Sequence, residues 1–250
     1  IPVVAVNDAP MKTAFDNRYG TGQSCVFAIG DVLDRAGIGL RDQTAVVIGY
    51  GPVGEGVAAH LRALRAEVAV AETDPVRALR AAHDGYATGR LRDLAPGSLV
   101  ISATGAPHTV DAAILRVARI VAVAGGVPGE VDVDRAGLRA YERDGIAIPH
   151  LDRAGDGALL LARGGCVNLA AAEGNPIEIM DLSFAVQLSA VALLLRNALP
   201  PGVHPFPAEA DREVARAALT ARAERIDVPG SAQRHAQQDW RSPRYRAASA

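Results

Sequence analysis

The chain has 250 residues, of which 49% are apolar and 22% are charged, and its formal net charge is −2. This balance is that of a soluble globular protein with a sizeable core, and it favours neither nucleic acid nor a membrane as a partner. Two distant cysteines, Cys25 and Cys166, are expected to be small buried hydrophobes in a reducing compartment, without a metal or disulfide framework. No run reaches transmembrane length and no charged-then-apolar leader opens the chain, so we expect a cytoplasmic protein.

The chain opens on IPVVAV, a β-branched strand pattern that starts without a methionine, and we expect further sequence upstream of Ile1 in the native protein. Strand-length apolar runs then alternate with helical patterns. Strands are expected near 44–48, 67–71, 98–104, 119–125 and 145–149, and helices near 53–65, 75–84 and 111–117. At least five alternations predict an α/β fold, a doubly wound Rossmann-type parallel sheet.

Two helices of different character follow the expected sheet. Residues 177–197 are expected to form an apolar helix with hydrophobic side chains on more than one face, which has to be buried on most sides by further sequence or by a partner subunit. Residues 208–226 form an amphipathic helix with a solvated face. We therefore expect three parts: 1–20 as an inter-domain connection, 21–175 as the domain that contains the sheet, and 176–250 as C-terminal helices and tail.

A glycine cluster, GYGPVGEG, places Gly49, Gly51 and Gly54 in the G-x-G-x-x-G pattern between a strand and a helix. The glycines provide a tight turn, close approach of a pyrophosphate and close helix–strand packing. Glu72 ends the next strand, where it would accept hydrogen bonds from the ribose hydroxyls and repel a 2′-phosphate, so NAD is favoured over NADP. Arg77 weakens that preference slightly, and the alternative is a glycine-rich turn in a sheet that binds no nucleotide.

The turn after the strand 98–104 should border the nicotinamide, with Thr104 and Gly105 lining the cofactor through backbone groups. His108 follows in the same turn, where a solvated loop histidine is the default interpretation. The six histidines have no metal-ligand spacing, so no metal site is expected.

Six blocks taken together resemble the adenosylhomocysteinase family over nearly the whole chain: NDAPMKTAFDNRYGTGQS, GYGPVGEG, AETDPVRAL, EVDVD, VNLAAAEGNP and SPRY. The resemblance implies tightly bound NAD⁺ that oxidises the 3′-hydroxyl of a nucleoside, followed by elimination of homocysteine, addition of water and return of the hydride. It also implies that Pro52, Val53, Asn168 and Asn175 contribute to the cofactor site.

Lys12 is the only lysine in the chain, and the rest of the 26 lysine and arginine residues are arginines. The resemblance implies that Lys12 and Asp16 contact the ribose hydroxyls, and that Lys12 takes up the 3′-hydroxyl proton. Arginine stays charged at any relevant pH, whereas a lysine can become a base. The resemblance places Asn17 against the nicotinamide and Asn7 near the substrate. The alternative is a solvated lysine that escaped replacement.

The sequence also departs from the family. Gly126 stands where family members usually carry a histidine, and Asn175 replaces a second histidine in the segment EGNP. An amide cannot carry a proton at neutral pH as imidazole can. Near the C-terminus, Arg241 and Tyr245 match the spacing of a lysine and a tyrosine that reach the NAD of a neighbouring subunit, which implies a homo-oligomer, a dimer or tetramer.

Three functions remain open at this point. The first is an NAD-dependent enzyme that oxidises a secondary hydroxyl of a nucleoside or sugar-like small molecule through Lys12 and Asp16. The second is hydrolysis of S-adenosylhomocysteine with its proton transfers rerouted. The third is an NAD-binding subunit without chemistry of its own.

Overall fold

A computed structural model gives the fold and describes residues 1–134, 136–196 and 198–239. The chain divides into two compact units after Val214. The first unit contains both sheets. The second begins inside α9 (Ala208–Ala221) and includes α10 (Ser231–Gln238). The end of α9 at Ala221 is earlier than the sequence pattern, which extended it to residue 226.

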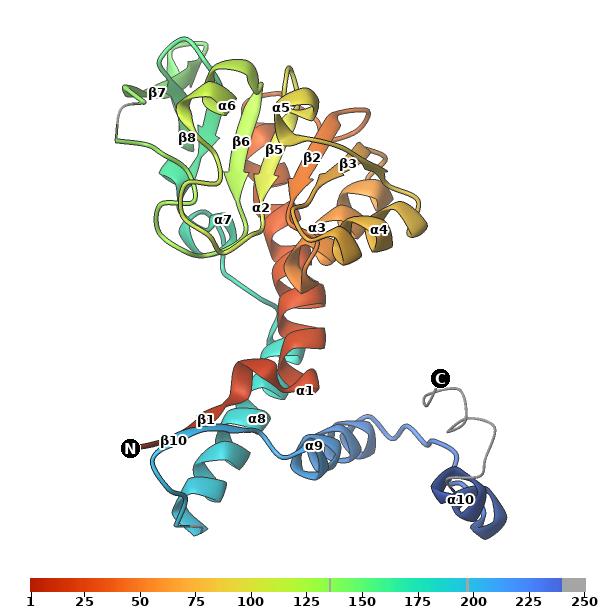
Figure 1. Cartoon of the computed structure of the whole chain (residues 1–250). Coiled ribbons are helices and arrows are strands. Elements are labelled where there is room, and N and C mark those ends of the chain that lie inside the picture. Colours follow the sequence, from red (N-terminus) through yellow and green to blue (C-terminus); the bar gives the residue numbers. More distant parts are fainter. Residues whose placement is uncertain (135, 197, 240–250) are drawn as a thin grey trace. The chain divides into compact units, whose positions relative to one another are not determined.

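The main sheet of the first unit has eight strands in the order β4-β3-β2-β5-β6-β9-β8-β7 (Figure 1). The strands from β4 to β9 are parallel, and the order reverses direction between β2 and β5, which is the topology of a doubly wound sheet. The predicted fold class is therefore confirmed. The strands are β2 (Thr44–Ile48), β3 (Glu67–Ala71), β4 (Ala87–Thr88), β5 (Leu99–Ser102), β6 (Ile120–Val123), β7 (Leu138–Arg143), β8 (Ile146–Ala154) and β9 (Leu159–Leu161).

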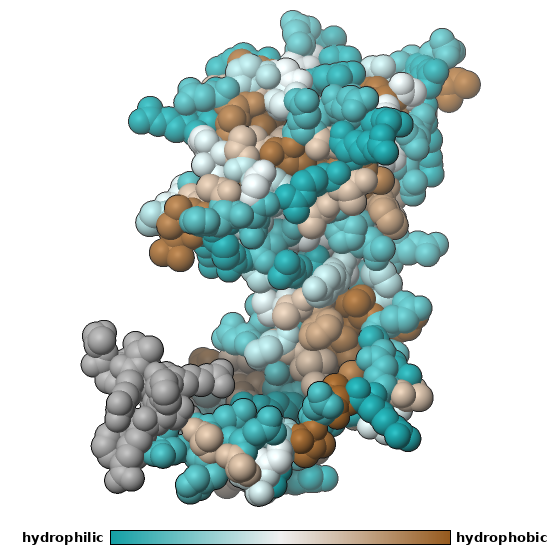
Figure 2. Space-filling view, turned by 90° about the vertical axis from the view of Figure 1, so that its right-hand side faces the viewer, coloured by the Kyte–Doolittle hydropathy of each residue, from teal (hydrophilic) through white to brown (hydrophobic). Residues whose placement is uncertain are grey.

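Helices cover both faces of this sheet because its strands bury alternate side chains in two separate cores. Val47 packs in one core with side chains of α2 and α3, whereas Val46 packs in the other with side chains of α5 and α6. The face of this part seen at the top of Figure 2 is largely hydrophilic, with apolar residues in small scattered groups. The helices and turns of this part are α2 (Gly22–Arg35), α3 (Pro52–Ala63), α4 (Pro75–His83), α5 (Leu91–Leu94), α6 (Ala112–Val117), η3 (Ala162–Gly164) and α7 (Val167–Ala170).

The far edge of the sheet differs from the expected alternation. Residues 145–149 were expected as one more strand of the parallel series, but they begin β8, which pairs antiparallel with β7 and β9. The turn between β7 and β8 is Asp144–Gly145, and both residues have positive φ, 54° and 78°. A two-residue Asp-Gly loop of this kind joins neighbouring antiparallel strands, so no crossover helix fits there.

The first residues and the long C-terminal helix form a second region of the first unit, which we call the helix junction: residues 1–21 together with 177–205. The expected first strand, β1 (Pro2–Ala5), pairs in parallel with β10 (Gly202–Pro205). The junction further contains η1 (Val6–Asp8), α1 (Pro10–Lys12), η2 (Thr13–Thr21) and α8 (Ile177–Arg196). The segment η2 is a nine-residue π-helix that runs directly into α2, and the sequence analysis missed both helices.

The helix α8 lies where the sequence predicts it, but its length and composition contradict one prediction about membrane spans. Its length and composition would allow it to cross a membrane, so the statement that no run reaches that length is wrong. One such helix is weak evidence for a membrane span. Ser183 and Val186 are fully buried on one side of α8, whereas Leu188 and Leu195 are 70% and 83% exposed. The helix therefore combines a packed face with an uncovered apolar face.

Candidate functional site

An open pocket of about 1140 Å³ lies at the carboxyl ends of the parallel strands β2, β3 and β5. This is where ligands bind in doubly wound sheets, and the volume suits a ligand as long as a dinucleotide. The lining includes most residues predicted for the cofactor and one predicted for the substrate. Those residues are Asn7, Asn17, Gly49, Gly51, Pro52, Val53, Glu72, Arg77, Thr104 and Gly105.

The glycine loop fits a phosphate group beside the start of α3. Gly49 has φ +89°, a conformation that side chains rarely adopt, and a Cβ at Gly54 would overlap the carbonyl oxygen of Gly49. A Cβ at Gly51 would meet only Nη1 of Arg77, at 3.6 Å. Apart from Arg77, no other part of the protein fills the space beside Gly51, so protein packing does not explain why this residue lacks a side chain. Because this space adjoins the N-terminus of a helix, it is suited to a pyrophosphate.

Glu72 stands at the end of β3 as an anion held by backbone amides. One carboxylate oxygen accepts from the amide of Tyr50 at 2.6 Å, and the other accepts from the amides of Thr73 and Asp74 at 2.6 and 2.9 Å. Burial acts to raise the pKa of Glu72, but these hydrogen bonds outweigh burial and leave the pKa below its usual value. Glu72 is therefore ionised at neutral pH and can accept from ribose hydroxyls.

The same end of the pocket includes residues that the sequence analysis missed. Thr88, Gly89, Arg90 and Leu91 line the pocket from the segment that begins in β4. β4 has only two residues, which is too short to produce a period-2 pattern. These residues lie on the Glu72 side of the sheet, which is the adenosine side when the pyrophosphate is at the glycine loop.

Lys12 lies where the short helix α1 passes into the π-helix η2. Its Nζ lies 2.7 Å from Oδ1 of Asn17 and 3.3 Å from Oδ2 of Asp16. These residues are five and four positions along the chain, and the i→i+5 bonding of a π-helix brings both onto the side of Lys12. An α-helix would turn the fifth residue away. Asn17 lines the pocket, so Lys12 contacts a lining residue although it is absent from the lining itself.

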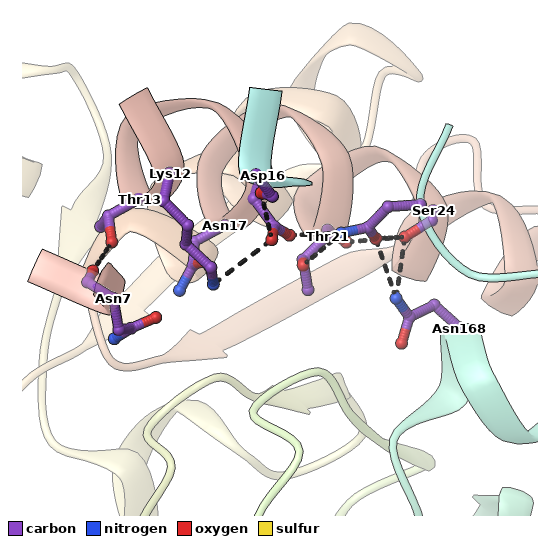
Figure 3. A network of polar contacts seen from close by, with 10 residues as sticks. Asn7, Lys12, Thr13, Asp16, Asn17, Thr21, Ser24 and Asn168 are labelled. Atoms are coloured by element: carbon purple, nitrogen blue, oxygen red, sulfur yellow. Dashed lines mark hydrogen bonds and ion pairs between the residues drawn. The ribbon is translucent and has the colours of Figure 1, made fainter. Parts of the chain in front are cut away.

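The carboxylate of Asp16 is the centre of a buried polar network (Figure 3). Nδ2 of Asn175 donates to Oδ1 at 2.6 Å, and the hydroxyl of Ser183 donates to Oδ2 at 2.9 Å. Asn175 in turn accepts from Ser24 at 2.9 Å and from Nδ2 of Asn168 at 3.1 Å. Asn168 and Asn175 therefore lie behind Asp16 and are absent from the lining of the pocket.

The network contains hydroxyls that sequence reasoning missed. Ser183 lies 167 positions from Asp16, and Thr21 accepts from Asn175 at 3.2 Å. The available signal was Ser183 itself, which lies in the apolar helix α8. A buried hydroxyl requires a hydrogen-bond partner, so a serine in such a helix indicates a polar contact. Neither the partner nor its distance can be read from the sequence.

Comparison with known proteins identifies the group to which this arrangement belongs. The family model described as "S-adenosyl-L-homocysteine hydrolase, NAD binding domain" matches residues 17–174. The chain belongs to the adenosylhomocysteinase family. Within it, the adenosylhomocysteinase of Thermosynechococcus vestitus is 36% identical over 96% of this chain and 58% of its own length. That of Saccharolobus solfataricus is 40% identical over 96% and 59%, and the S-inosyl-L-homocysteine hydrolase of Methanopyrus kandleri is 36% identical over 96% and 58%.

The family resemblance and the cofactor, NAD, are thus confirmed. The chain spans somewhat under two thirds of the length of these adenosylhomocysteinase relatives. A solved structure of a D-3-phosphoglycerate dehydrogenase from Ralstonia solanacearum, described as putative in its name, is similar in fold. Its TM-score is 0.51 at 15% identity, over 76% of this chain and 66% of that one.

Both departures from the adenosylhomocysteinase pattern lie near the site. Gly126 has φ +81°, and Asn175 uses both ends of its amide within the network behind Asp16. A Cβ at Gly20 would lie 3.0 Å from Nδ2 of Asn175, so the amide is closely packed. Among the described residues, the side chains that hydrogen-bond around Asp16 include no histidine.

The two cysteines meet in this family member, which their sequence separation did not indicate. Cys25 is fully buried as expected, whereas Cys166 is only partly buried. The hydrogen bond between the thiols raises the pKa of Cys25 and lowers the pKa of Cys166. Cys166 also donates to Oδ1 of Asn168 at 2.9 Å, so the cysteine pair joins the network behind Asp16.

His108 lies on the pocket lining, with its Nδ1 2.6 Å from Oδ1 of Asp132, and its side chain is 80% exposed. This is the loop position that the sequence predicted. Arg241 and Tyr245, predicted from the family pattern, lie outside the described residues.

Proposed function

We propose that this member of the adenosylhomocysteinase family uses NAD to oxidise a secondary hydroxyl, of the ribose 3′ type, on a nucleoside or sugar-like small molecule. The observation that carries the proposal is the position of Lys12, whose Nζ contacts both Asp16 and Asn17, and Asn17 lines the pocket. NAD⁺, when bound, supplies the acceptor for the hydride that leaves the substrate carbon.

In this proposal Lys12 accepts the proton of the reacting hydroxyl. Proton transfer requires the neutral amine, which a lysine can reach and an arginine cannot. Asp16 acts as a fixed anion, because Asn175 and Ser183 donate to its two oxygens. Asp16 can therefore orient Lys12 and accept from a neighbouring substrate hydroxyl without changing its own position.

The remaining residues of the pocket hold the cofactor in the same proposal. The loop from Gly49 to Val53 takes the pyrophosphate, Glu72 takes the adenosine ribose, and Thr104 and Gly105 border the nicotinamide end. Asn17 bridges the two groups of residues, because it lines the pocket and accepts from Lys12.

The absence of imidazole at Gly126 and Asn175 favours oxidation over the complete sequence of elimination and hydration. The amide of Asn175 can orient a water or hydroxyl but cannot transfer a proton at neutral pH. Hydrolysis of S-adenosylhomocysteine is the second candidate, because relatives that match 96% of this chain carry the name adenosylhomocysteinase.

The proposal also covers the roles of the three parts of the chain, the oligomeric state and the location in the cell. The three parts 1–20, 21–175 and 176–250 act as connection, cofactor domain and C-terminal segment in a cytoplasmic homo-oligomer. The uncovered apolar face of α8, with Leu188 and Leu195, suits contact with a substrate domain or a neighbouring subunit.

The test is the near-ultraviolet absorbance of the purified protein, loaded with NAD⁺, during additions of adenosine, S-adenosylhomocysteine and simple polyols. Growth of the reduced-nicotinamide band with one ligand supports the proposal and identifies the substrate class. Release of adenosine and homocysteine from S-adenosylhomocysteine would support the second candidate. Bound cofactor that no ligand reduces would leave a binding subunit and overturn the proposed oxidation.

A further inference from the structure

A buried carboxylate, Glu130, lies beneath the end of the pocket formed after β5 and β6. Its side chain is fully buried. Oε2 accepts from the hydroxyl of Ser102 at 2.5 Å and from the hydroxyl of Thr104 at 3.3 Å, and Oε1 accepts from the amide of Val127 at 3.2 Å. Both side-chain oxygens therefore have hydrogen-bond donors in a place that water does not reach.

Glu130 differs from most other buried acids of the chain in its partners. Among the described residues, no lysine, arginine or histidine lies within ion-pair distance of it, whereas three of the other buried acids face cations. Those pairs are Asp16 with Lys12, Glu55 with Arg18 and Arg80, and Asp152 with Arg163. A buried carboxylate without a counter-charge is costly, and among the described residues only hydrogen bonds from Ser102, Thr104 and Val127 offset that cost.

The carboxylate is in direct contact with the lining of the pocket. Thr104 and Gly125 both line the pocket, and a Cβ at Gly125 would overlap Oε1 of Glu130. A side chain at residue 125 would collide with the carboxyl group in this position, so Glu130 packs directly against the backbone of a lining residue. This end lies on the far side of the glycine loop from Glu72, which is the nicotinamide end for a dinucleotide bound across the sheet.

We propose that Glu130 is a positioning residue for NAD that favours the oxidised over the reduced form. The oxidised nicotinamide ring is positively charged and the reduced ring is neutral. A fixed negative charge in a medium of low dielectric constant stabilises the cationic ring and has little effect on the neutral one. The carboxylate also orients the hydroxyl of Thr104, which lies in the turn that borders the ring.

This inference rests on NAD binding in the pocket and is independent of the substrate proposed above. The experiment measures the dissociation constants of NAD⁺ and NADH on stripped full-length protein, for the wild type and Glu130→Gln. We expect the preference for NAD⁺ to fall by about tenfold in Glu130→Gln, because the amide has a similar shape but no charge. Failure of the substrate proposal would instead appear as normal binding of both forms without ligand-driven reduction.

Two controls separate charge from structure. Glu142→Gln removes the same charge from an exposed position on β7 and should leave the ratio of the two dissociation constants unchanged. Ser102→Ala removes one of the donors to the carboxyl group but not the group itself, so it should lower the melting temperature and change the ratio less than Glu130→Gln does. A purely structural role of Glu130 would move both constants together.

A folded Glu130→Gln protein with an unchanged ratio would overturn the proposal, since the carboxyl would then be neutral or too distant to act on the ring. If this variant does not fold, the double variant Ser102→Ala/Glu130→Met removes the charge and its closest donor together, which leaves fewer unsatisfied groups. Thr104 keeps other partners in that variant, because its hydroxyl also bonds Thr109 and the amide of Ala106. The same loss of preference for NAD⁺ is expected, and an unchanged ratio would again overturn the proposal.

Discussion

The cofactor pocket and the helix junction are built in different ways. The pocket is formed largely by short segments that each follow a strand, such as the glycine loop after β2 and the turn after β5. The network at the junction joins residues that lie far apart in the chain, since Asp16 contacts Asn175 and Ser183 at separations of 159 and 167 positions. Local geometry thus determines the cofactor site, whereas packing of distant elements determines the surroundings of Lys12.

Substitutions in the two regions should therefore affect different measurable properties. A change in the pocket should alter cofactor affinity and leave the surroundings of Lys12 intact. A change in the junction at a residue that does not line the pocket, which excludes Asn7 and Asn17, should alter turnover or stability and leave cofactor affinity intact. Substitutions in the two regions can therefore be compared by the same pair of measurements, cofactor binding and substrate-dependent reduction.

The largest effect is expected at the junction, from Lys12→Ala. Removal of the proton acceptor should lower the rate of substrate-dependent cofactor reduction by about 10²–10⁴. NAD⁺ affinity should stay within a few-fold, because the lysine contacts Asp16 and Asn17 and is absent from the pocket lining. Single-turnover absorbance and equilibrium binding measure the two quantities. Lys12→Arg is the matched control that keeps the charge, and recovery of the rate in this variant would contradict proton transfer by Lys12.

In the pocket, Gly51→Val should weaken NAD⁺ binding by at least about tenfold, which corresponds to about 1.4 kcal/mol of binding free energy. The added side chain would occupy the space beside α3 that has only Arg77 as a protein neighbour. The melting temperature should change little for the same reason. Gly39→Val is the control, because a Cβ at Gly39 meets nothing within 4 Å and Gly39 is absent from the pocket lining. Equal binding by both variants would contradict the assignment of the phosphate site.

A smaller effect is expected from Ser183→Ala, which removes a donor to the buried carboxylate of Asp16. The free energy of unfolding should fall by about 1.5–3 kcal/mol, the range for hydrogen bonds to charged groups. Turnover should fall less than in Lys12→Ala, and NAD⁺ affinity should be unchanged. Chemical denaturation measures stability. Ser98→Ala, whose buried hydroxyl donates to the neutral carbonyl of Leu94 at 2.8 Å, is the control and should cost less.

The smallest effect concerns the pH dependence of Glu72. The pKa of Glu72 in the folded protein is below the ordinary value of 4.5. Its contribution to stability is therefore fully present above pH 4.5 and is lost as the pH falls through the lower folded pKa. The difference in unfolding free energy between the wild type and Glu72→Gln, measured by denaturation from pH 7 to acid, should be constant and then shrink. A difference that grows toward acid pH would contradict the lowered pKa.

The sequence predicted the pocket half of the molecule well, because its signals are local. The strands 44–48 and 67–71 have the predicted bounds, and the glycines between them take the conformations that the motif requires. Asp144–Gly145 is a turn signal for the hairpin of β7 and β8, but the preceding alternation of strands and helices predicts a further parallel strand there, and that prediction is wrong.

The junction was predicted less completely, for physical reasons. A π-helix has no composition of its own, so the contacts of Lys12 with both Asp16 and Asn17 follow from a backbone geometry that the sequence does not display. The helix α2 did have a readable apolar period, with Cys25, Ile29 and Leu33 at four-residue spacing, all of them buried. The meeting of Cys25 with Cys166 depends on how α2 packs near α7, which no local pattern states.

The pairing of β1 with β10 has a mechanical consequence. The register runs from Pro2 with Gly202 to Ala5 with Pro205, so the segment that leads into η2 is hydrogen-bonded to the segment that follows α8. A bending motion at this place would have to carry both segments as one body or break the ladder between them. The amide of Gly202 donates to the carbonyl of Ile1, and the amides that face the partner strand alternate along a parallel ladder. Hydrogen exchange at the amides of Val3 and His204 should then occur in a single opening event, and the ladder would act as the pivot about which Lys12 and Ser183 move together.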